Sequence, residues 1–169
     1  MFGEFIPLRP VLGLFINEVL SIPMGDLSRG GTDQPSLKIA GQKIAVNICY
    51  EDAFGEEIIR ALPEATLLVN VSNDAWYGDS HAAAQHNQMS QMRALESGRM
   101  MLRATNTGVT SIIGRDGRIQ QMLPQHEEGM LSGLVQGYVG STPYVRWGNA
   151  LVLGLLVLTL ASAWRLCRR

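Results

Sequence analysis

The sequence predicts a mixed α/β domain over residues 1–146, followed by one membrane-spanning helix. Two short β-rich runs on either side of a helical stretch indicate a strand–helix–strand unit. A run without any charge, residues 147–164, precedes a basic tail at 165–169. The chain has 169 residues, which leaves room for one domain with a sizeable core.

The first predicted strand covers residues 43–49, KIAVNIC, between Ala40-Gly41 and the acidic run that follows. Residues 56–62 have helical character and end at a proline. Residues 66–72, TLLVNVS, form a second apolar run before the polar and aromatic loop NDAWYGDSH. Because strands joined through a helical crossover run in the same direction, we expect these two strands to pair in parallel.

A long helix is expected over residues 82–102, which contain no proline and one glycine. Its apolar residues recur at helical spacing, and we expect them to pack in the core. They are Met89, Met92, Leu95 and Leu102.

A hairpin is expected next, because residues 109–113 and 118–122 flank an Asp116-Gly117 turn. Residues 130–135 can supply one further strand.

The charge-free run 147–164 has the length of about 17–25 residues that a helix needs to cross a bilayer. Trp147 and Trp164 lie at its ends, where tryptophan favours the headgroup region. Arginines follow at once, and basic flanks tend to stay cytoplasmic, which places residues 1–146 on the other side of the membrane. A buried core helix is the alternative.

Charge and motif content exclude several classes of function. Fourteen Lys and Arg residues against fifteen Asp and Glu residues give a formal charge of -1, which argues against a nucleic-acid partner. The three histidines, at 81, 86 and 126, lack metal-ligand spacing, so no metal site is predicted, and we interpret them as solvated or capping residues. Cys49 and Cys167 lie in different contexts and form no disulfide framework.

Cys49 is the candidate nucleophile, because it closes the first predicted strand. A cysteine at a strand-to-helix turn can point its sulfur into a cleft, where the helix N-terminus favours the thiolate. A small buried hydrophobic residue is the alternative. The adjoining Glu51 and Asp52 favour the reactive cysteine, since two acids beside a buried thiol need a task such as orientation or proton transfer.

Five motifs together resemble the apolipoprotein N-acyltransferases, membrane-embedded members of the nitrilase or carbon–nitrogen hydrolase superfamily. The similarity runs along essentially the whole chain and includes the closing helix. It implies the C-terminal part of a nitrilase-type αββα sandwich that carries a Glu–Lys–Cys triad. The motifs are FGEFIP at 2–7, LSRG at 27–30, NICYEDAF at 47–54, NVSNDAWYGDS at 70–80 and RALESGR at 93–99.

The resemblance also assigns roles to single residues. It implies that Cys49 is the nucleophile and that Glu4 is an additional essential glutamate near the sulfur. Tyr50 and Glu51 match positions that the family requires for activity, with Glu51 orienting or shaping the site. The remaining pair, Trp76 and Tyr77, falls in a loop near the active site, as lipid contacts or as packed aromatic residues.

The implied reaction transfers a fatty acyl group from a membrane phospholipid to Cys49 as a thioester. The N-terminal amine of a lipidated apolipoprotein then accepts it. The implied location is the bacterial inner membrane, with the catalytic domain on the periplasmic side. Neither a cofactor nor a metal is implied.

The sequence departs from the family pattern in its upstream part. No residue matches the family's general-base glutamate, and its triad lysine would precede the motif that holds Glu4. The only lysines are Lys38 and Lys43, and Lys43 is about 20 Å from Cys49 along an extended strand. We therefore expect a truncated C-terminal portion, without the family's seven upstream membrane helices and inactive by itself. The alternatives are an amidase acting on a small amide and a non-catalytic membrane-tethered remnant.

Overall fold

The computed structural model describes residue 31 and residues 33–168. Glu4, one of the predicted site residues, and the segment 1–30 that contains it lie outside the described residues.

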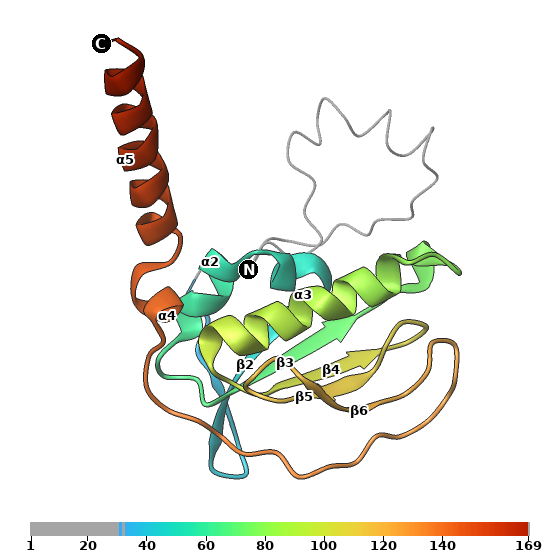
Figure 1. Cartoon of the computed structure of the whole chain (residues 1–169). Helices are drawn as coiled ribbons and strands as arrows, with labels where there is room; N and C mark the ends of the chain where they lie inside the picture. Colours follow the sequence, from blue (N-terminus) through green and yellow to red (C-terminus); the bar gives the residue numbers. More distant parts are fainter. Residues whose placement is uncertain (1–30, 32, 169) are drawn as a thin grey trace.

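The described part of the chain forms one six-stranded sheet whose strands lie side by side in chain order (Figure 1). The three central strands run in parallel, and the outer strands pair antiparallel. The expected parallel pair and hairpin are thereby confirmed. The strands are β1 (Leu37–Ile39), β2 (Gln42–Ile48), β3 (Leu67–Ser72), β4 (Met101–Thr105), β5 (Ser111–Ile113) and β6 (Ile119–Met122).

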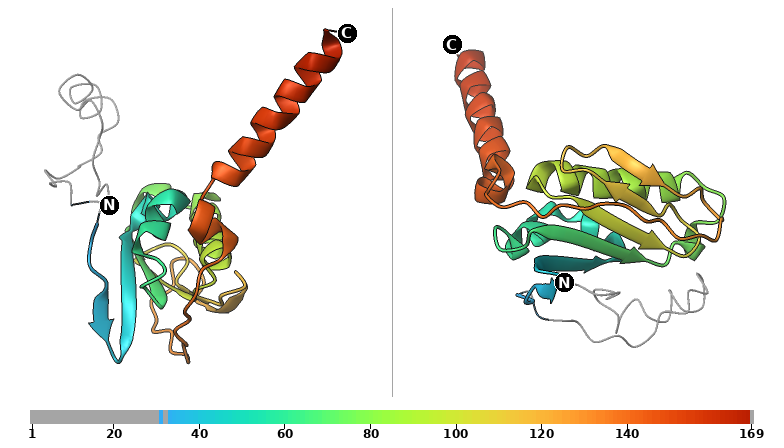
Figure 2. Two further views of the ribbon diagram at one scale, coloured as in Figure 1. Left: turned by 90° about the vertical axis from the view of Figure 1, so that its left-hand side faces the viewer. Right: turned by 90° about the horizontal axis from the view of Figure 1, so that it is seen from below.

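Helices cover one face of this sheet, and the irregular segment 123–142 packs on the other (Figures 1 and 2). The short turns and helices that follow β2 lead directly into the crossover to β3. In chain order the helical elements are η1 (Cys49–Ala53), α2 (Gly55–Ile58), η2 (Ile59–Ala61), η3 (Ala75–Tyr77), α3 (Ala82–Ser97), α4 (Pro143–Trp147) and α5 (Ala150–Cys167).

Each face of the sheet has its own apolar cluster, because side chains alternate between faces along a strand. Under the helices, one aligned row crosses four strands and is buried with residues of η2 and α3. This row is Ala45, Leu68, Met101 and Ile113. On the opposite face the neighbouring row packs against Leu131 and Tyr138 of segment 123–142. That row is Val46, Val69, Leu102 and Ile112.

The long helix ends earlier than the sequence predicted. Instead of continuing to residue 102, α3 ends at Ser97, and Gly98 caps it in a left-handed conformation with φ +65°. Met101 and Leu102 belong to strand β4, which the sequence interpretation missed. A glycine is the residue that adopts this conformation at least cost, so it separates the helix from the strand.

The apolar residues of α3 were expected in the core, and this prediction is wrong for three of them. Met89, Met92 and Leu95 are 41–50% exposed. The polar side of the helix, including His86 and Ser90, faces the sheet instead. The reason is that the sheet beneath α3 presents polar partners there, as the site geometry shows.

Two further expectations need correction. Residues 130–135 form no strand, although Leu131 of that segment packs on the apolar cluster of the open face. The hairpin strand β1, which turns through Ala40 and Gly41 into β2, was not predicted.

The C-terminal segment forms the apolar helix α5, shifted by about three residues from the predicted range 147–164. It projects away from the domain (Figures 1 and 2), and every described residue of it is exposed. Length and composition allow it to cross a membrane. Among the described residues no element covers it, which disfavours the alternative of a buried core helix.

Candidate active site

Cys49 is the first residue after β2 and opens η1. Its φ of +53° lies in the left-handed region, which a residue with a side chain adopts only when its surroundings enforce it. The carboxyl ends of β2, β3 and β4 meet at this edge of the sheet, and a row of buried polar side chains crosses it. This row is Asn47, Asn70, Arg103 and Ser111.

Two side chains hold the backbone carbonyl of Cys49. The amide Nδ2 of Asn70 donates to this oxygen at 2.9 Å, and Nε2 of His86 lies 3.1 Å from it. Asn70 Nδ2 also lies 2.6 Å from Oδ1 of Asn47, which ties the carbonyl to the polar row. Because the carbonyl is fixed from two elements, the left-handed turn at Cys49 is fixed as well.

His86 belongs to a closed arrangement of four charged side chains, here called the four-charge ring: Asp52, Asp74, His86 and Arg103. Both carboxylates contact both cations. Nε2 of His86 lies 3.1 Å from Asp52, and Nδ1 lies 3.1 Å from Asp74. Arg103 reaches Asp52 at 3.2 Å and Asp74 at 2.9 Å. All four side chains are at most 3% exposed.

The ring shifts the pKa values of two of its members in opposite directions. Burial alone would lower the pKa of His86, but the hydrogen bonds to Asp52 and Asp74 outweigh it and raise this pKa to about 9. Burial alone would raise the pKa of Asp74. The hydrogen bonds from His86 and Ser72 and the charge of Arg103 outweigh burial and lower this pKa to about 2. At neutral pH His86 is therefore protonated and Asp74 is ionised.

Neutral groups extend the network around Arg103, although its Nε is buried without a hydrogen-bond partner among the described residues. Its Nη1 donates to Oδ1 of Asn70 at 2.7 Å and to Oγ of Ser90 at 3.0 Å, and Ser90 in turn donates to Asp52. Buried charges are retained at acceptable cost only when they are paired and hydrogen-bonded in this way.

Gly108 lies against the Asp74 carboxylate. A Cβ at this glycine would come within 2.0 Å of Asp74 Oδ2, so the close approach requires the absence of a side chain.

The predicted residues Tyr50 and Glu51 lie on the turn that follows Cys49. Glu51 is 2% exposed, and its carboxylate accepts a hydrogen bond from the backbone N–H of Ile48 at 2.8 Å, which closes the turn around Cys49. The half-buried Tyr50 ring packs edge-on against Phe54, with centroids 6.0 Å apart. Glu51 thus shapes the turn around Cys49, while Asp52 enters the four-charge ring.

The two aromatic residues of η3, Trp76 and Tyr77, lie in different environments. Tyr77 packs edge-on against the His86 ring at 6.0 Å. Burial raises its pKa, and negative charge on Cys49 and on Asp74 adds to this, so Tyr77 lies within electrostatic range of the thiol. Trp76 is 51% exposed.

The interpretation of His86 as a solvated or capping residue is wrong, because His86 lies at the centre of the buried network. Asn70, Asp74 and Arg103 were not singled out as site residues. Asn70 and Asp74 fall inside the NVSNDAWYGDS motif, which was the available signal. Lys43 lies at the opposite end of β2 from Cys49, where its amine is 3.9 Å from Glu64.

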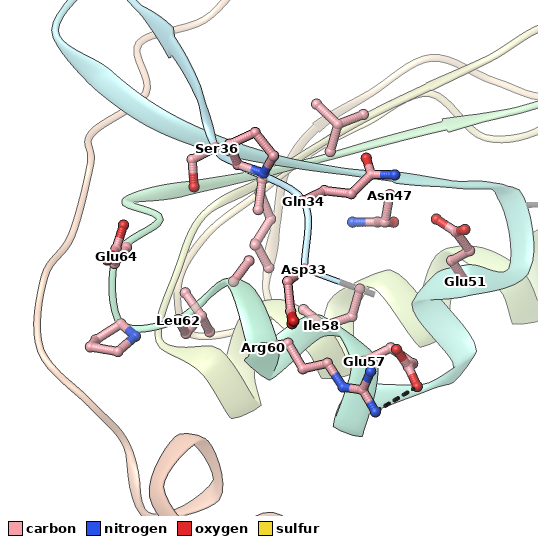
Figure 3. Close-up of a pocket in the computed structure, with 16 residues that line it drawn as sticks. Asp33, Gln34, Ser36, Asn47, Glu51, Glu57, Ile58, Arg60, Leu62 and Glu64 are labelled. Carbon is pink, nitrogen blue, oxygen red and sulfur yellow. Dashed lines mark ion pairs between the residues drawn. The ribbon is translucent and has the colours of Figure 1, made fainter. Parts of the chain in front are cut away.

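A cavity of about 470 Å³ opens beside this edge, between β2, α2 and residues 33–36 (Figure 3). Asn47 and Glu51 line its inner end, and the Glu57–Arg60 ion pair, at 3.3 Å, lies at its rim. Nδ2 of Asn47 is buried there without a hydrogen-bond partner among the described residues. The rest of the lining is largely apolar.

A family model for carbon-nitrogen hydrolases matches residues 7–144, which is most of the chain. The chain belongs to the carbon–nitrogen hydrolase family. Cys49, the four-charge ring and the sheet edge that carries them all lie inside this carbon–nitrogen hydrolase domain, whereas α5 follows it.

Curated relatives of this carbon–nitrogen hydrolase are named apolipoprotein N-acyltransferases. One from Nitrosomonas europaea is 61% identical over 161 residues, which are 95% of this chain and 32% of the relative. One from Methylococcus capsulatus is 52% identical over 154 residues, 91% of this chain and 30% of the relative. The chain spans about a third of the length of the curated relatives it matches.

Solved structures confirm the nitrilase-type fold. A carbon-nitrogen hydrolase from Helicobacter pylori G27 superposes with a TM-score of 0.53 at 12% identity, over 60% of this chain and 43% of that one. A variant of the amidase from Nesterenkonia sp. AN1, with acrylamide added at its active-site cysteine, gives 0.52 at 21% identity, over 61% of this chain and 42% of that one. The described sheet with helices on one face corresponds to the C-terminal part of the αββα sandwich.

Proposed function

We propose that this chain is the C-terminal portion of an apolipoprotein N-acyltransferase. The enzyme would transfer a fatty acyl group from a membrane phospholipid to the N-terminal amine of a lipidated apolipoprotein. The observation that carries the proposal is the 61% identity to a relative of that name over 161 residues. Within this match, Cys49 lies in a left-handed turn at a parallel strand end, which suits a nucleophile.

The proposed reaction has two steps. The Cys49 sulfur attacks the ester carbonyl of the phospholipid, the ester C–O bond breaks, and a lysophospholipid leaves. The apolipoprotein amine then attacks the thioester, an amide bond forms, and the thiol is regenerated. Glu51, which holds the Ile48 N–H, keeps the turn in shape during both steps. Glu4 and Tyr50 are proposed site residues from the family resemblance, and this thioester chemistry needs no cofactor or metal.

The proposed location is the bacterial inner membrane. In this arrangement residues 1–146 form the partial nitrilase-like domain on the periplasmic side, residues 147–164 span the bilayer, and residues 165–169 are cytoplasmic. The apolar and fully exposed helix α5 supports this proposal. Trp76, half exposed on η3, and its neighbour Tyr77 are the proposed lipid contacts.

The second candidate function is hydrolysis of a small amide. It is favoured by the likeness to the amidase from Nesterenkonia sp. AN1 and disfavoured by helix α5, which a soluble amide substrate does not require. A third candidate is a non-catalytic remnant. It is favoured by the match to only about a third of the length of the Nitrosomonas europaea relative.

A chimera tests the proposal. Residues 1–169 replace the matching segment of the Nitrosomonas europaea relative, and acylation of a lipidated N-terminal cysteine peptide is followed by mass spectrometry. We expect activity in this chimera and a loss on the order of 10⁶-fold in Cys49→Ala. Cys167→Ala is the matched control and should stay active. Acylation by the Cys49→Ala chimera would contradict the covalent role, and hydrolysis of short amides without acylation would favour the amidase.

The isolated 169-residue chain should form no thioester when incubated with radiolabelled phospholipid. General acid–base help is worth about 10²–10⁴-fold, and loss of an oxyanion donor costs about 10²–10³-fold. A hydroxylamine-sensitive label on Cys49 would show that the chain is active by itself.

A further inference from the structure

The four-charge ring has one contact that charge pairing alone does not explain. Nε2 of His86 lies 3.1 Å from Asp52 and also 3.1 Å from the backbone carbonyl of Cys49. The ring therefore touches the residue that carries the thiol, through its main chain.

The partners of His86 fix its protonation state. Nδ1 faces a carboxylate oxygen of Asp74, and Nε2 faces a carboxylate oxygen and a carbonyl oxygen. All three oxygens accept hydrogen bonds and have no proton to donate, since Asp52 and Asp74 are themselves paired with Arg103. Both ring nitrogens must then carry a proton, and His86 is an imidazolium.

The charged and titratable groups around His86 come from each element packed against it. Asp52 comes from η1, Asp74 follows β3, Arg103 comes from β4, and Tyr77 of η3 packs edge-on against the ring. Two acids and one arginine leave a net charge of -1 around the imidazole, which the imidazolium neutralises. This balance holds the cation in place at neutral pH.

The carbonyl of Cys49 needs such a donor because of its backbone conformation. A cysteine with φ +53° lies in a region that residues with a side chain rarely adopt, so the turn persists only if other contacts fix it. The donors on the carbonyl are Asn70 and His86. Asn70 comes from the neighbouring strand, whereas His86 comes from α3, so the two donors hold the carbonyl from different elements, and the donor on His86 belongs to a charged ring.

We propose that His86 is a positioning residue: its imidazolium, held by Asp52 and Asp74, fixes the Cys49 carbonyl and thereby the turn that presents the thiol. This rests on the proposed function only in taking Cys49 as the nucleophile. His86 exchanges no proton with substrate, and its effect reaches the reaction through the placement of the sulfur.

The test uses the chimera described above with His86→Leu, His86→Gln and the control His126→Gln. His126 is also paired with an aspartate, at 2.9 Å from Asp79, but it lies on the surface. We expect His86→Leu to lower kcat by about 10²-fold with KM changed less than about twofold, because misplaced reacting groups cost about that much. His86→Gln should recover about tenfold of the loss, since its side-chain N–H can reach the same carbonyl. The control should be unchanged.

A second readout is independent of the acyltransfer reaction. The alkylation rates of Cys49 and of the exposed Cys167 by iodoacetamide are followed site by site, and their ratio is compared between variants. The ratio should fall about tenfold in His86→Leu. In the unsubstituted chimera it should also fall as pH rises past about 9, where His86 loses its proton, and it should not do so in His86→Gln.

The acylation and alkylation readouts distinguish failure of the proposed function from failure of the positioning role of His86. An unsubstituted chimera that shows no acylation but retains the His86-dependent alkylation ratio would overturn the proposed function and support the positioning role. The positioning role is overturned if glutamine restores nothing, or if the alkylation ratio of the unsubstituted chimera stays flat across pH 9. The pH result needs no substitution, so it remains decisive if His86→Leu does not fold.

Discussion

The two faces of the sheet are built from adjacent residues of the same strands, yet one face carries buried polar groups next to Cys49 and the other carries aliphatic packing. On the helix-covered face, the row Asn47–Asn70–Arg103 is polar, buried and linked to Cys49. On the opposite face, one residue earlier in each strand, the row Val46–Val69–Leu102 is aliphatic. The same strands therefore contribute apolar packing to the open face and a specific arrangement of charged and polar groups to the helix-covered face. Substitutions on the helix-covered face should therefore cost more stability than substitutions on the open face, and they should also change its dependence on pH.

The largest effect is expected from Arg103→Leu. It leaves Asp52 and Asp74 buried with one cation between them, which should cost about 3–5 kcal/mol. Pulse proteolysis of the chimera in urea measures the loss. The matched control is Arg118→Leu, because Arg118 is 88% exposed and 3.7 Å from Asp116, a kind of pair worth at most about 1 kcal/mol. Equal effects of both substitutions would show that the ring contributes no more than a surface pair.

The pH dependence of stability should separate the two faces, since the aliphatic row has no group that titrates. The pKa of His86 is raised to about 9 in the folded protein, so its contribution is complete below pH 6.5 and is lost as pH rises through 9. The pKa of Asp74 is lowered to about 2, so its contribution is complete above pH 3.8 and is lost as pH falls through 2.

The same urea assay across pH 2–10 measures this dependence. The alkaline loss should reach about 3 kcal/mol in the unsubstituted chimera and be absent in His86→Gln. An alkaline loss of the same size in His86→Gln would assign it to another group.

Gly108→Ala should disturb the ring without removing any charge. The added Cβ would meet Asp74 Oδ2 at 2.0 Å and push the carboxylate from its partners, at a cost of about 1–3 kcal/mol. The control is Gly31→Ala, because a Cβ at Gly31 would meet none of the described residues within 4 Å. Unfolding midpoints that coincide for the two variants would mean that Asp74 tolerates displacement.

The smallest effect is expected on the aliphatic face. Val69 is half-buried, so Val69→Ala removes two methyl groups from partial contact and should cost about 1 kcal/mol. Acylation by the chimera should change less than about threefold, because this row has no contact with the Cys49 carbonyl. A larger loss of activity than of stability would show that the two faces are coupled.

The sequence predicts the apolar part of this fold well. The runs that became β2 and β3, their parallel pairing, the Asp116-Gly117 hairpin and the position of Cys49 at a strand end all follow from local patterns. The strands, the hairpin turn and the place of Cys49 depend on neighbours within a few residues, and the parallel pairing follows from the helical crossover between the two strands, so local patterns are sufficient for all of them.

The buried charges could not be predicted in the same way. His86 and Arg103 are seventeen residues apart and meet only because Asp52 and Asp74 come between them in space. Local pattern assigned the apolar side of α3 to the core. Tertiary pairing reverses this, because η1 supplies the Asp52 carboxylate and β4 the Arg103 guanidinium, and Ser90 of α3 hydrogen-bonds to both.

The junction at Gly148 limits the distance between Cys49 and helix α5. Gly148 has φ +52° and separates α4 from α5, and the following Asn149 N–H donates to Glu56 of α2 at 2.7 Å. Glu56 is only seven residues along the chain from Cys49. At about 3.6 Å for each residue, plus the Glu56 and Cys49 side chains, the hydrogen bond and the step from Asn149 to Ala150, the thiol lies no more than ~40 Å from the first residue of α5. If α5 lies in the bilayer as proposed, this connection through Glu56 limits the distance between the nucleophile and the membrane, so that Cys49 can reach a phospholipid that remains in the bilayer.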